Sequence, residues 1–365
     1  MLQDPNLPII CDGIAEKIPA KSIYLCGSRA TGQGITESSD YDLGIVINTF
    51  LIPLYLGRLK RLERELSQKL RLDLVINPLP TFRIHRAKGN LFLFKLKREG
   101  ITLWGQDYIK SLDAGEIRDI DVDWHFSYLF SAMKDLVQDF EPGFISTNTD
   151  AQRSKRLIRN AAKAILYCGE IHLLVNGYYE TRIDDMISRL SSLNYPPKSR
   201  AQFLEDLKLS SDIRTGSIGR IEDPLGFWFR AKGHLLDTFQ ILMQNFWCVN
   251  SNSLDELAIQ YLSKSNKSLK NLQYLALTWL LRKEIFGKAL WSRCSVEDKI
   301  RMGLLWLLCS INEQGHITRR PLAQAYDALK GYINIPYSDD NVTFWRNIKS
   351  SIITYWPFAC AVMGL

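Results

Sequence analysis

The spacing of apolar and polar residues follows two patterns along this chain. A mixed pattern of strands and helices occupies the first hundred residues, and a helical pattern begins at Trp124. In the first hundred residues, short apolar runs end at polar turns, which predicts buried strands at 22–26, 43–47 and 72–76. Leucines recur at every third or fourth position of residues 56–70, which predicts an amphipathic helix. A lead-in helix is expected before Pro19, a second amphipathic helix at 82–98, and a short strand after it.

From Trp124 onward the pattern is helical almost to the end. Helices are expected at 124–140, 151–174, 182–193, 227–249, 269–286, 296–312, 321–329 and 341–361, with a loop-rich stretch at 194–219. Residues 250–267, rich in Ser and Asn, are expected to form a domain boundary with room for a short helix inside it. The expected fold class is α+β: a small mixed β-sheet with flanking helices, then an all-helical region of one or two lobes. We expect domains at 1–110, 111–250 and 251–365.

One stretch between two predicted strands carries candidate chemistry. Gly27 and Ser28 break the first strand, and after eleven intervening residues Asp40 and Asp42 open the second. Residues at i and i+2 of a strand face the same side, so both carboxylates point one way. Carboxylates beside a turn rich in backbone N–H groups suit a divalent metal and the phosphates that it neutralises.

A third acid, Asp73, lies in the predicted strand 72–76. A lone Asp in an apolar strand is costly to bury unless it is paired or bound to a metal. The alternative is an Asp that faces solvent at a strand edge.

The stretch GSRATG…SDYDL resembles the signature of the DNA polymerase beta-like nucleotidyltransferase superfamily, most of all its minimal and aminoglycoside nucleotidyltransferases. The resemblance implies that Asp40 and Asp42 bind metal, and that Asp73 completes the set or helps to deprotonate the acceptor. Two Mg²⁺ ions and a nucleoside triphosphate, with ATP the first choice, are the implied cofactor and co-substrate.

The turn after the first strand is the expected phosphate site. Gly27 and Ser28 would hold the outer phosphates through backbone N–H groups and the hydroxyl. Arg29 either assists them or enters a structural ion pair.

Further charged residues are accessory candidates. Residues 82–98 mix basic and aromatic side chains, so they form a helix with a basic outer face or bring bases such as Arg83 and Lys88 to phosphate. The helical region resembles the bundle that follows the catalytic domain in aminoglycoside nucleotidyltransferases, where an acid can serve as the general base. The candidates for that base, besides Asp73, are Glu170, Asp184 and Asp185.

Composition bears on the kind of substrate and on the cellular compartment. The net charge of +7 over 365 residues suits a polyanionic substrate without requiring one. Seven scattered cysteines indicate a reducing compartment, and neither a signal peptide nor a membrane span is visible. A cytoplasmic protein without a membrane partner is expected, and its C-terminal lobe shapes the acceptor site or a homodimer face.

The expected reaction is transfer of an NMP, with AMP from ATP the first choice, to a hydroxyl or phosphate of a small molecule, a protein or an RNA. One alternative is a toxin–antitoxin or defence nucleotidyltransferase that acts on tRNA or a partner protein. Another is an inactive nucleotide-binding scaffold, which would have lost an acid. All three acids are present.

Overall fold

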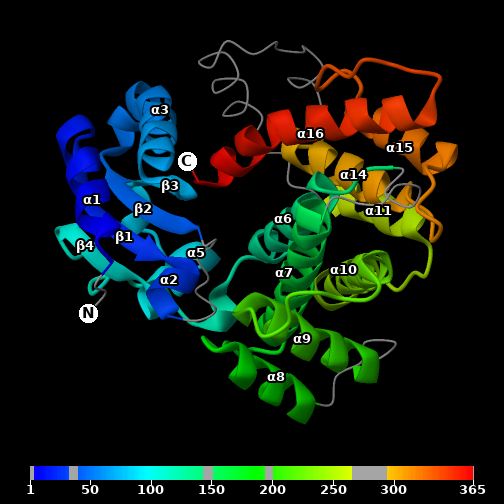
Figure 1. Cartoon of the computed structure of the whole chain (residues 1–365), viewed down its shortest axis with the longest axis horizontal. Coiled ribbons are helices and arrows are strands. Elements are labelled where there is room, and N and C mark those ends of the chain that lie inside the picture. The colour runs from blue at the N-terminus through cyan, green and yellow to red at the C-terminus, as the bar shows by residue number, and fades with distance from the viewer. Residues whose placement is uncertain (1–3, 33–39, 143–150, 194–199, 265–293, 365) are drawn as a thin grey trace. The chain divides into compact units, whose positions relative to one another are not determined.

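The computed structural model describes residues 4–32, 40–142, 151–193, 200–264 and 294–364 (Figure 1). The chain forms two compact units. The sheet unit runs to Trp124 and includes Gly177–Asp185, and the helical unit holds His125–Asn176 and Met186–Met363. The fold is therefore α+β, as the hydrophobic pattern predicts.

Four strands form the mixed sheet of the first unit. They are β1 (Ala20–Cys26), β2 (Tyr41–Ile47), β3 (Leu74–Pro80) and β4 (Ile101–Gly105), in the order β3-β2-β1-β4. β1 is antiparallel to β2 and β4, whereas β2 and β3 are parallel. The parallel pair is connected through α3 (Ile52–Leu70), the usual way to join parallel strands.

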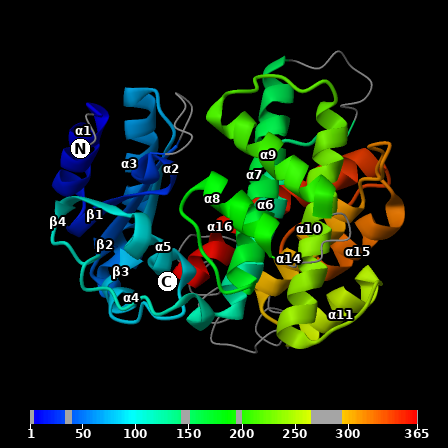
Figure 2. The same ribbon diagram turned by 90° about the horizontal axis from the view of Figure 1, so that it is seen from below.

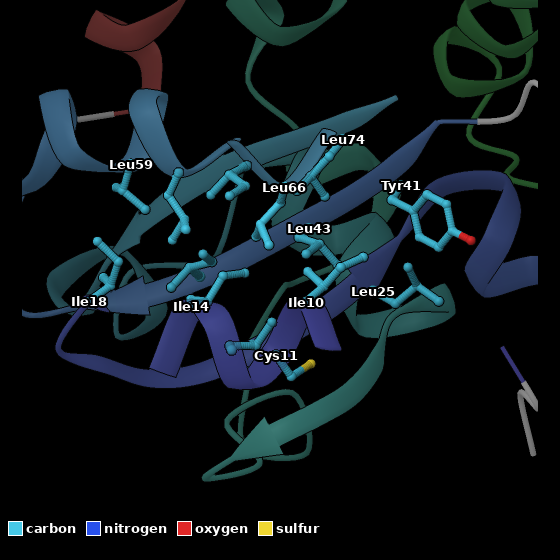
Figure 3. Close-up of a cluster of buried hydrophobic side chains, with 14 of the residues drawn as sticks. Ile10, Cys11, Ile14, Ile18, Leu25, Tyr41, Leu43, Leu59, Leu66 and Leu74 are labelled. Atoms are coloured by element: carbon cyan, nitrogen blue, oxygen red, sulfur yellow. The ribbon is translucent and has the colours of Figure 1, made fainter. Parts of the chain in front are cut away.

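One face of the sheet is covered by α1 (Asn6–Lys17) and α3. Figure 3 shows side chains of both helices directed at apolar residues of β1 and β2. The cluster includes Ile10, Ile14, Leu25, Leu43, Leu59 and Leu66. Burial of such side chains is worth roughly 1.5–3 kcal/mol each, so this face supplies much of the unit's stability.

The opposite face is covered by α5 (Leu91–Glu99), which follows the short α4 (Thr81–Ile84). Its core includes Tyr24, Val46, Leu79, Leu93 and Leu96, with Cys26 packed partly buried against it. Strand alternation explains the division, since neighbouring residues of β1 and β2 enter different cores.

Two predictions for this unit are wrong in detail. The helix expected over 82–98 is broken into α4 and α5, and Gly89 between them has a φ of +82° beside Asp119 and Asp121. The strand expected to end at Asn77-Pro78 continues to Pro80. β3 lies at the edge of the sheet, where a proline's missing N–H removes no ladder hydrogen bond.

The rest of the described chain is helical. Two single-turn 3₁₀ helices lie in the sheet unit, at Thr49–Leu51 and Ile117–Asp119. The helices that follow are α6 (Val122–Gln138), α7 (Ala151–Val175), α8 (Ile183–Ser192), α9 (Arg200–Thr215), α10 (Pro224–Trp247), α11 (Leu254–Lys264), α14 (Val296–Cys309), α15 (Arg319–Leu329) and α16 (Asn341–Gly364). In the helical unit, α7 packs against α9 and α10 (Figure 2).

The loop-rich interpretation of residues 194–219 is wrong, because α9 occupies most of this stretch. Its inner face buries Asp206 and Ser210 beside Phe203 and Leu207, so polar residues interrupt the apolar stripe that would have indicated a helix. The helix expected at 269–286 lies outside the described residues. No helix within the described ranges has the length and apolarity needed to cross a membrane.

Candidate active site

Strand alternation brings Asp40 and Asp42 to the face of the sheet that α5 covers. Tyr41 is buried in the core beneath α1 and α3, so its neighbour Asp42 faces the other way. Asp42 is in register with Cys26, which packs against the core beside α5. Asp40 immediately precedes β2 with the same parity as Asp42, as the i and i+2 spacing predicts.

Asp73 meets these two acids at the same end of the sheet. The backbone N–H of Tyr41 donates to the carbonyl of Asp73 at 2.7 Å, and Tyr41 is in register with Leu74. Continued by one residue, this parallel register sets Asp73 beside Asp40. Adjacent strands are about 4.8 Å apart, so carboxylates on them can share an ion. We call this region, defined by Asp40, Asp42 and Asp73, the carboxylate end.

The donor chemistry of the carboxylate end fits Mg²⁺, since carboxylate oxygens are hard ligands. Asp73 is exposed, whereas Asp40 and Asp42 are half-buried. In the described conformation, no three His, Cys, Asp or Glu side chains of the described residues are grouped as a metal site. The strand register places the three acids at the same end of the sheet. Their side chains would need to rotate before they could bind one ion together.

Gly27 joins the turn after β1 to the carboxylate end. Its φ is +67°, which favours glycine, and a Cβ there would lie 2.8 Å from Oδ2 of Asp42. The chain turns here from β1 into the single-turn helix α2 (Gly27–Thr31). Ser28 is half-buried in α2, and its carbonyl accepts the hydroxyl of Thr31 at 3.2 Å. The turn of the motif and its second acid thus lie so close together that no side chain fits at position 27.

Arg29 has a structural environment. Its guanidinium lies 3.7 Å from the centre of the Tyr41 ring and 3.4 Å from Oδ2 of Asp4. The Tyr41 hydroxyl donates to the same Asp4 oxygen at 2.6 Å. Since Tyr41 and Asp42 face opposite sides of β2, these contacts draw Arg29 toward the α1 side. The ion-pair alternative describes these contacts, and the phosphate role remains a prediction.

The pKa of the Cys26 thiol is affected by the negative charges near the carboxylate end. Burial raises its pKa to about 12, and the negative charge of Asp42 contributes to the rise, with a smaller part from Glu99. A thiol with so high a pKa stays protonated near neutral pH and is neither a nucleophile nor a ready metal ligand.

Glu99 is a residue that motif reasoning did not assign to the site. It ends α5, and two residues later Ile101 pairs with Leu25 of β1, at the end that leads into Gly27. The hydroxyl of Tyr179 donates a hydrogen bond to Oε1 of Glu99. The sequence signal that could have found it is the Glu99-Gly100 pair directly after a helix.

Arg83 and Lys88 lie away from the carboxylate end. Both come after the C-terminal end of β3, whereas Asp73 precedes its N-terminal end, and the seven residues of this strand are about 23 Å long at ~3.3 Å per residue. Lys88 is 3.5 Å from Asp119. Burial lowers the pKa of Arg83, and its Nε has no hydrogen-bond partner among the described residues. The geometry gives no support to a phosphate role for either side chain.

The acids proposed as a general base from the helical region have other contacts. Glu170 of α7 accepts a hydrogen bond from the Tyr128 hydroxyl at 2.6 Å, and the Tyr128 ring stacks on Tyr167. Asp184 is exposed in the first turn of α8, where an acid stabilises the helix dipole. A catalytic role for Glu170 or Asp184 remains a prediction.

Comparison with known proteins identifies no relative of this chain. No protein-family model matches the chain, and neither the curated proteins nor the solved structures give a match. What the chain does is therefore inferred from its own residues. The contact between Gly27 and Asp42 is the strongest observation available for that inference.

Proposed function

We propose that this chain is a Mg²⁺-dependent nucleotidyltransferase that moves an NMP, with AMP from ATP the first choice, onto an acceptor. The observation that carries the proposal is the close approach of the Gly27 turn to the Asp42 carboxylate, at the sheet end that also bears Asp40 and Asp73. A phosphate-binding turn next to clustered carboxylates is what transfer of a charged phosphoryl group requires. The cytoplasm, which supplies ATP and Mg²⁺, is the proposed location.

Each residue has a role in the proposed reaction. Asp40, Asp42 and Asp73 would hold Mg²⁺, which when bound neutralises phosphate charge and makes the acceptor hydroxyl more acidic. Gly27 and Ser28 would orient the outer phosphates through backbone N–H groups and the Ser28 hydroxyl. The acceptor oxygen forms a bond to the α-phosphorus as the bond to pyrophosphate breaks, and the proton leaves to a base.

The test is transfer of label from ATP labelled in its α-phosphate, with Mg²⁺, to three acceptor pools. The pools are bulk tRNA, a mixture of aminoglycosides and the protein fraction of a cell lysate. We expect wild type to label one pool, and the double variant Asp40→Ala/Asp42→Ala to label it at least a thousandfold more slowly. Asp12→Asn, which changes an exposed acid on α1, is the matched control and should behave as wild type.

The labelled pool identifies the acceptor. Label in tRNA favours the toxin–antitoxin or defence alternative, and label in aminoglycosides favours an antibiotic-modifying enzyme. If the double variant labels as fast as wild type, the proposed site is wrong. If wild type binds ATP with Mg²⁺ but labels nothing, the scaffold alternative replaces catalysis.

A further inference from the structure

Tyr179 lies in a segment that follows α7 in sequence and packs on the sheet unit. It is 80 residues from Glu99 in sequence, yet its hydroxyl donates a hydrogen bond to Oε1 of Glu99. Its ring meets the ring of Phe94 edge-on, with 5.3 Å between centroids. The surrounding segment, Gly177–Asp185, belongs to the sheet unit. Two contacts of different kinds thus fix the position of this tyrosine on α5.

The Glu99 carboxylate lies at the carboxylate end. Glu99 is the last residue of α5, the helix that covers the face to which Asp42 belongs. The following strand pairs with β1 through Ile101 and Leu25, directly before the Gly27 turn. The charges of Asp42 and Glu99 both act on the Cys26 thiol, as secondary contributions after burial. Glu99 and Asp42 therefore lie near the same point of the sheet from two different elements.

We propose that Glu99 is a further carboxylate of the active site, which accepts the proton of the acceptor hydroxyl, and that Tyr179 is its positioning residue. The inference rests on the proposed nucleotidyl transfer and names the base that the sequence left open. The acceptor oxygen bonds to the α-phosphorus, the bond from that phosphorus to pyrophosphate breaks, and the bonding electrons leave with pyrophosphate. The hydroxyl proton passes to Glu99 and then to water.

Chemistry favours Glu99 over the metal-binding acids for this step. Oxygens of Asp40, Asp42 and Asp73 that bind a cation have lower proton affinity. A carboxylate offers about four lone-pair positions, so Glu99 can accept from Tyr179 and from a substrate hydroxyl together. A base needs a fixed orientation, and the Tyr179 hydrogen bond supplies one.

The competing explanation is that the pair only fastens the Gly177–Asp185 segment to α5. Two conservative variants separate the explanations. Glu99→Gln keeps an oxygen that can accept from Tyr179 but cannot take up a proton at neutral pH. Tyr179→Phe keeps the ring against Phe94 and removes only the hydroxyl. Glu65→Gln, an exposed acid, and Tyr178→Phe, the neighbouring tyrosine, are the matched controls.

The experiment measures kcat and KM for ATP with Mg²⁺ on the labelled pool, the pH profile of kcat, and melting temperature. We expect Glu99→Gln to lower kcat at least a hundredfold and to lose the acid limb of the profile, with KM for ATP within twofold of wild type. Tyr179→Phe should lower kcat about tenfold. It should leave KM for ATP within twofold of wild type, because the Tyr179 hydroxyl orients the base and does not contact the nucleotide.

Three results would overturn the inference. Glu99→Gln with kcat within threefold of wild type shows that Glu99 is not the base, while the proposed transfer stands. Glu99→Gln with a melting temperature lowered by more than about 5 °C and a raised KM assigns the pair a structural role. Wild type that neither binds ATP with Mg²⁺ in equilibrium dialysis nor transfers label removes the proposed function itself and this inference with it.

Discussion

The carboxylate of Asp42 lies so close to Gly27 that a Cβ at position 27 would be 2.8 Å from its Oδ2. The Asp42 carboxylate, 15 positions away in sequence, thus occupies the space that a side chain at position 27 would need. The φ of +67° at Gly27 is a second reason for glycine at this position. The turn at Gly27 and the acid at position 42 cannot change independently, because any side chain at Gly27 displaces the Asp42 carboxylate.

Gly27→Ala should therefore impair catalysis more than stability. The new methyl group pushes the Asp42 carboxylate from its position, so nucleotidyl transfer should fall about a hundredfold or more, while the left-handed backbone costs roughly 1 kcal/mol of unfolding free energy. Gly32→Ala is the matched control. Gly32 has a φ of +74° and open space where its Cβ would lie, so it should show the stability loss without the catalytic loss. Equal transfer by the two variants would contradict the close approach.

Arg29→Met tests whether Arg29 serves the phosphates or the fold. The change removes the stack on Tyr41 and the half-buried ion pair with Asp4, so we expect a loss of about 1–2 kcal/mol in urea unfolding. The KM for ATP should stay within twofold. Arg58→Met, at an exposed arginine 5.5 Å from the Tyr55 ring, should cost less than ~0.5 kcal/mol. A tenfold rise in KM for ATP without a loss of stability would show that Arg29 binds the phosphates of ATP and does not stabilise the fold.

Part of this site could be predicted from sequence because local rules fix it. Alternation places Asp40 and Asp42 on one face, and the glycine at position 27 marks the turn. The contact of Glu99 with Tyr179 could not be predicted, because no periodicity encodes a hydrogen bond between residues 80 positions apart. The helix α9 was missed for a different reason: Asp206 is buried through its contacts with Arg230 and His234, which only the folded unit supplies.

His172 makes the helical unit sensitive to acid. Burial, followed by the nearby His234, lowers the pKa of His172 to about 3, and its Nε2 lies 3.1 Å from the Thr238 hydroxyl. The unfolded chain takes up a proton near pH 6.5, and the folded chain does so only near pH 3. Stability should therefore fall with pH below 6.5, by about 1.4 kcal/mol per unit, or about 2 kcal/mol at pH 5.

The measurement is urea unfolding of the helical unit between pH 7 and 4.5. His172→Gln keeps a polar partner for Thr238 and should flatten the dependence over this range. The neighbouring Asp206 does not produce the same slope. Burial alone would raise its pKa, but hydrogen bonds from His234 and Arg230 lower it, so its contribution is lost only below about pH 3.8. An unchanged slope in His172→Gln would assign the acid sensitivity to another group.

Arg301 is a buried cation of the helical unit, and removing it should be the most costly of these changes. Only 2% of the residue is exposed, and it contacts Glu297, Asp298, Ser127 and Tyr261. These partners lie on α6, α11 and α14, so one guanidinium holds three helices together. Arg301→Met keeps much of the side-chain volume but leaves two buried carboxylates without this cation, which costs about 3–5 kcal/mol.

The control for Arg301→Met is Arg320→Met, which removes an exposed arginine 3.3 Å from Asp255. Exposed pairs contribute ~0–1 kcal/mol, so the unfolding midpoint of this variant should hardly move. The triple variant Arg301→Met/Glu297→Gln/Asp298→Asn should recover part of the loss, because neutral amides are cheaper to bury than unpaired carboxylates. If Arg301→Met alone costs under ~1 kcal/mol, the guanidinium does not hold these helices together.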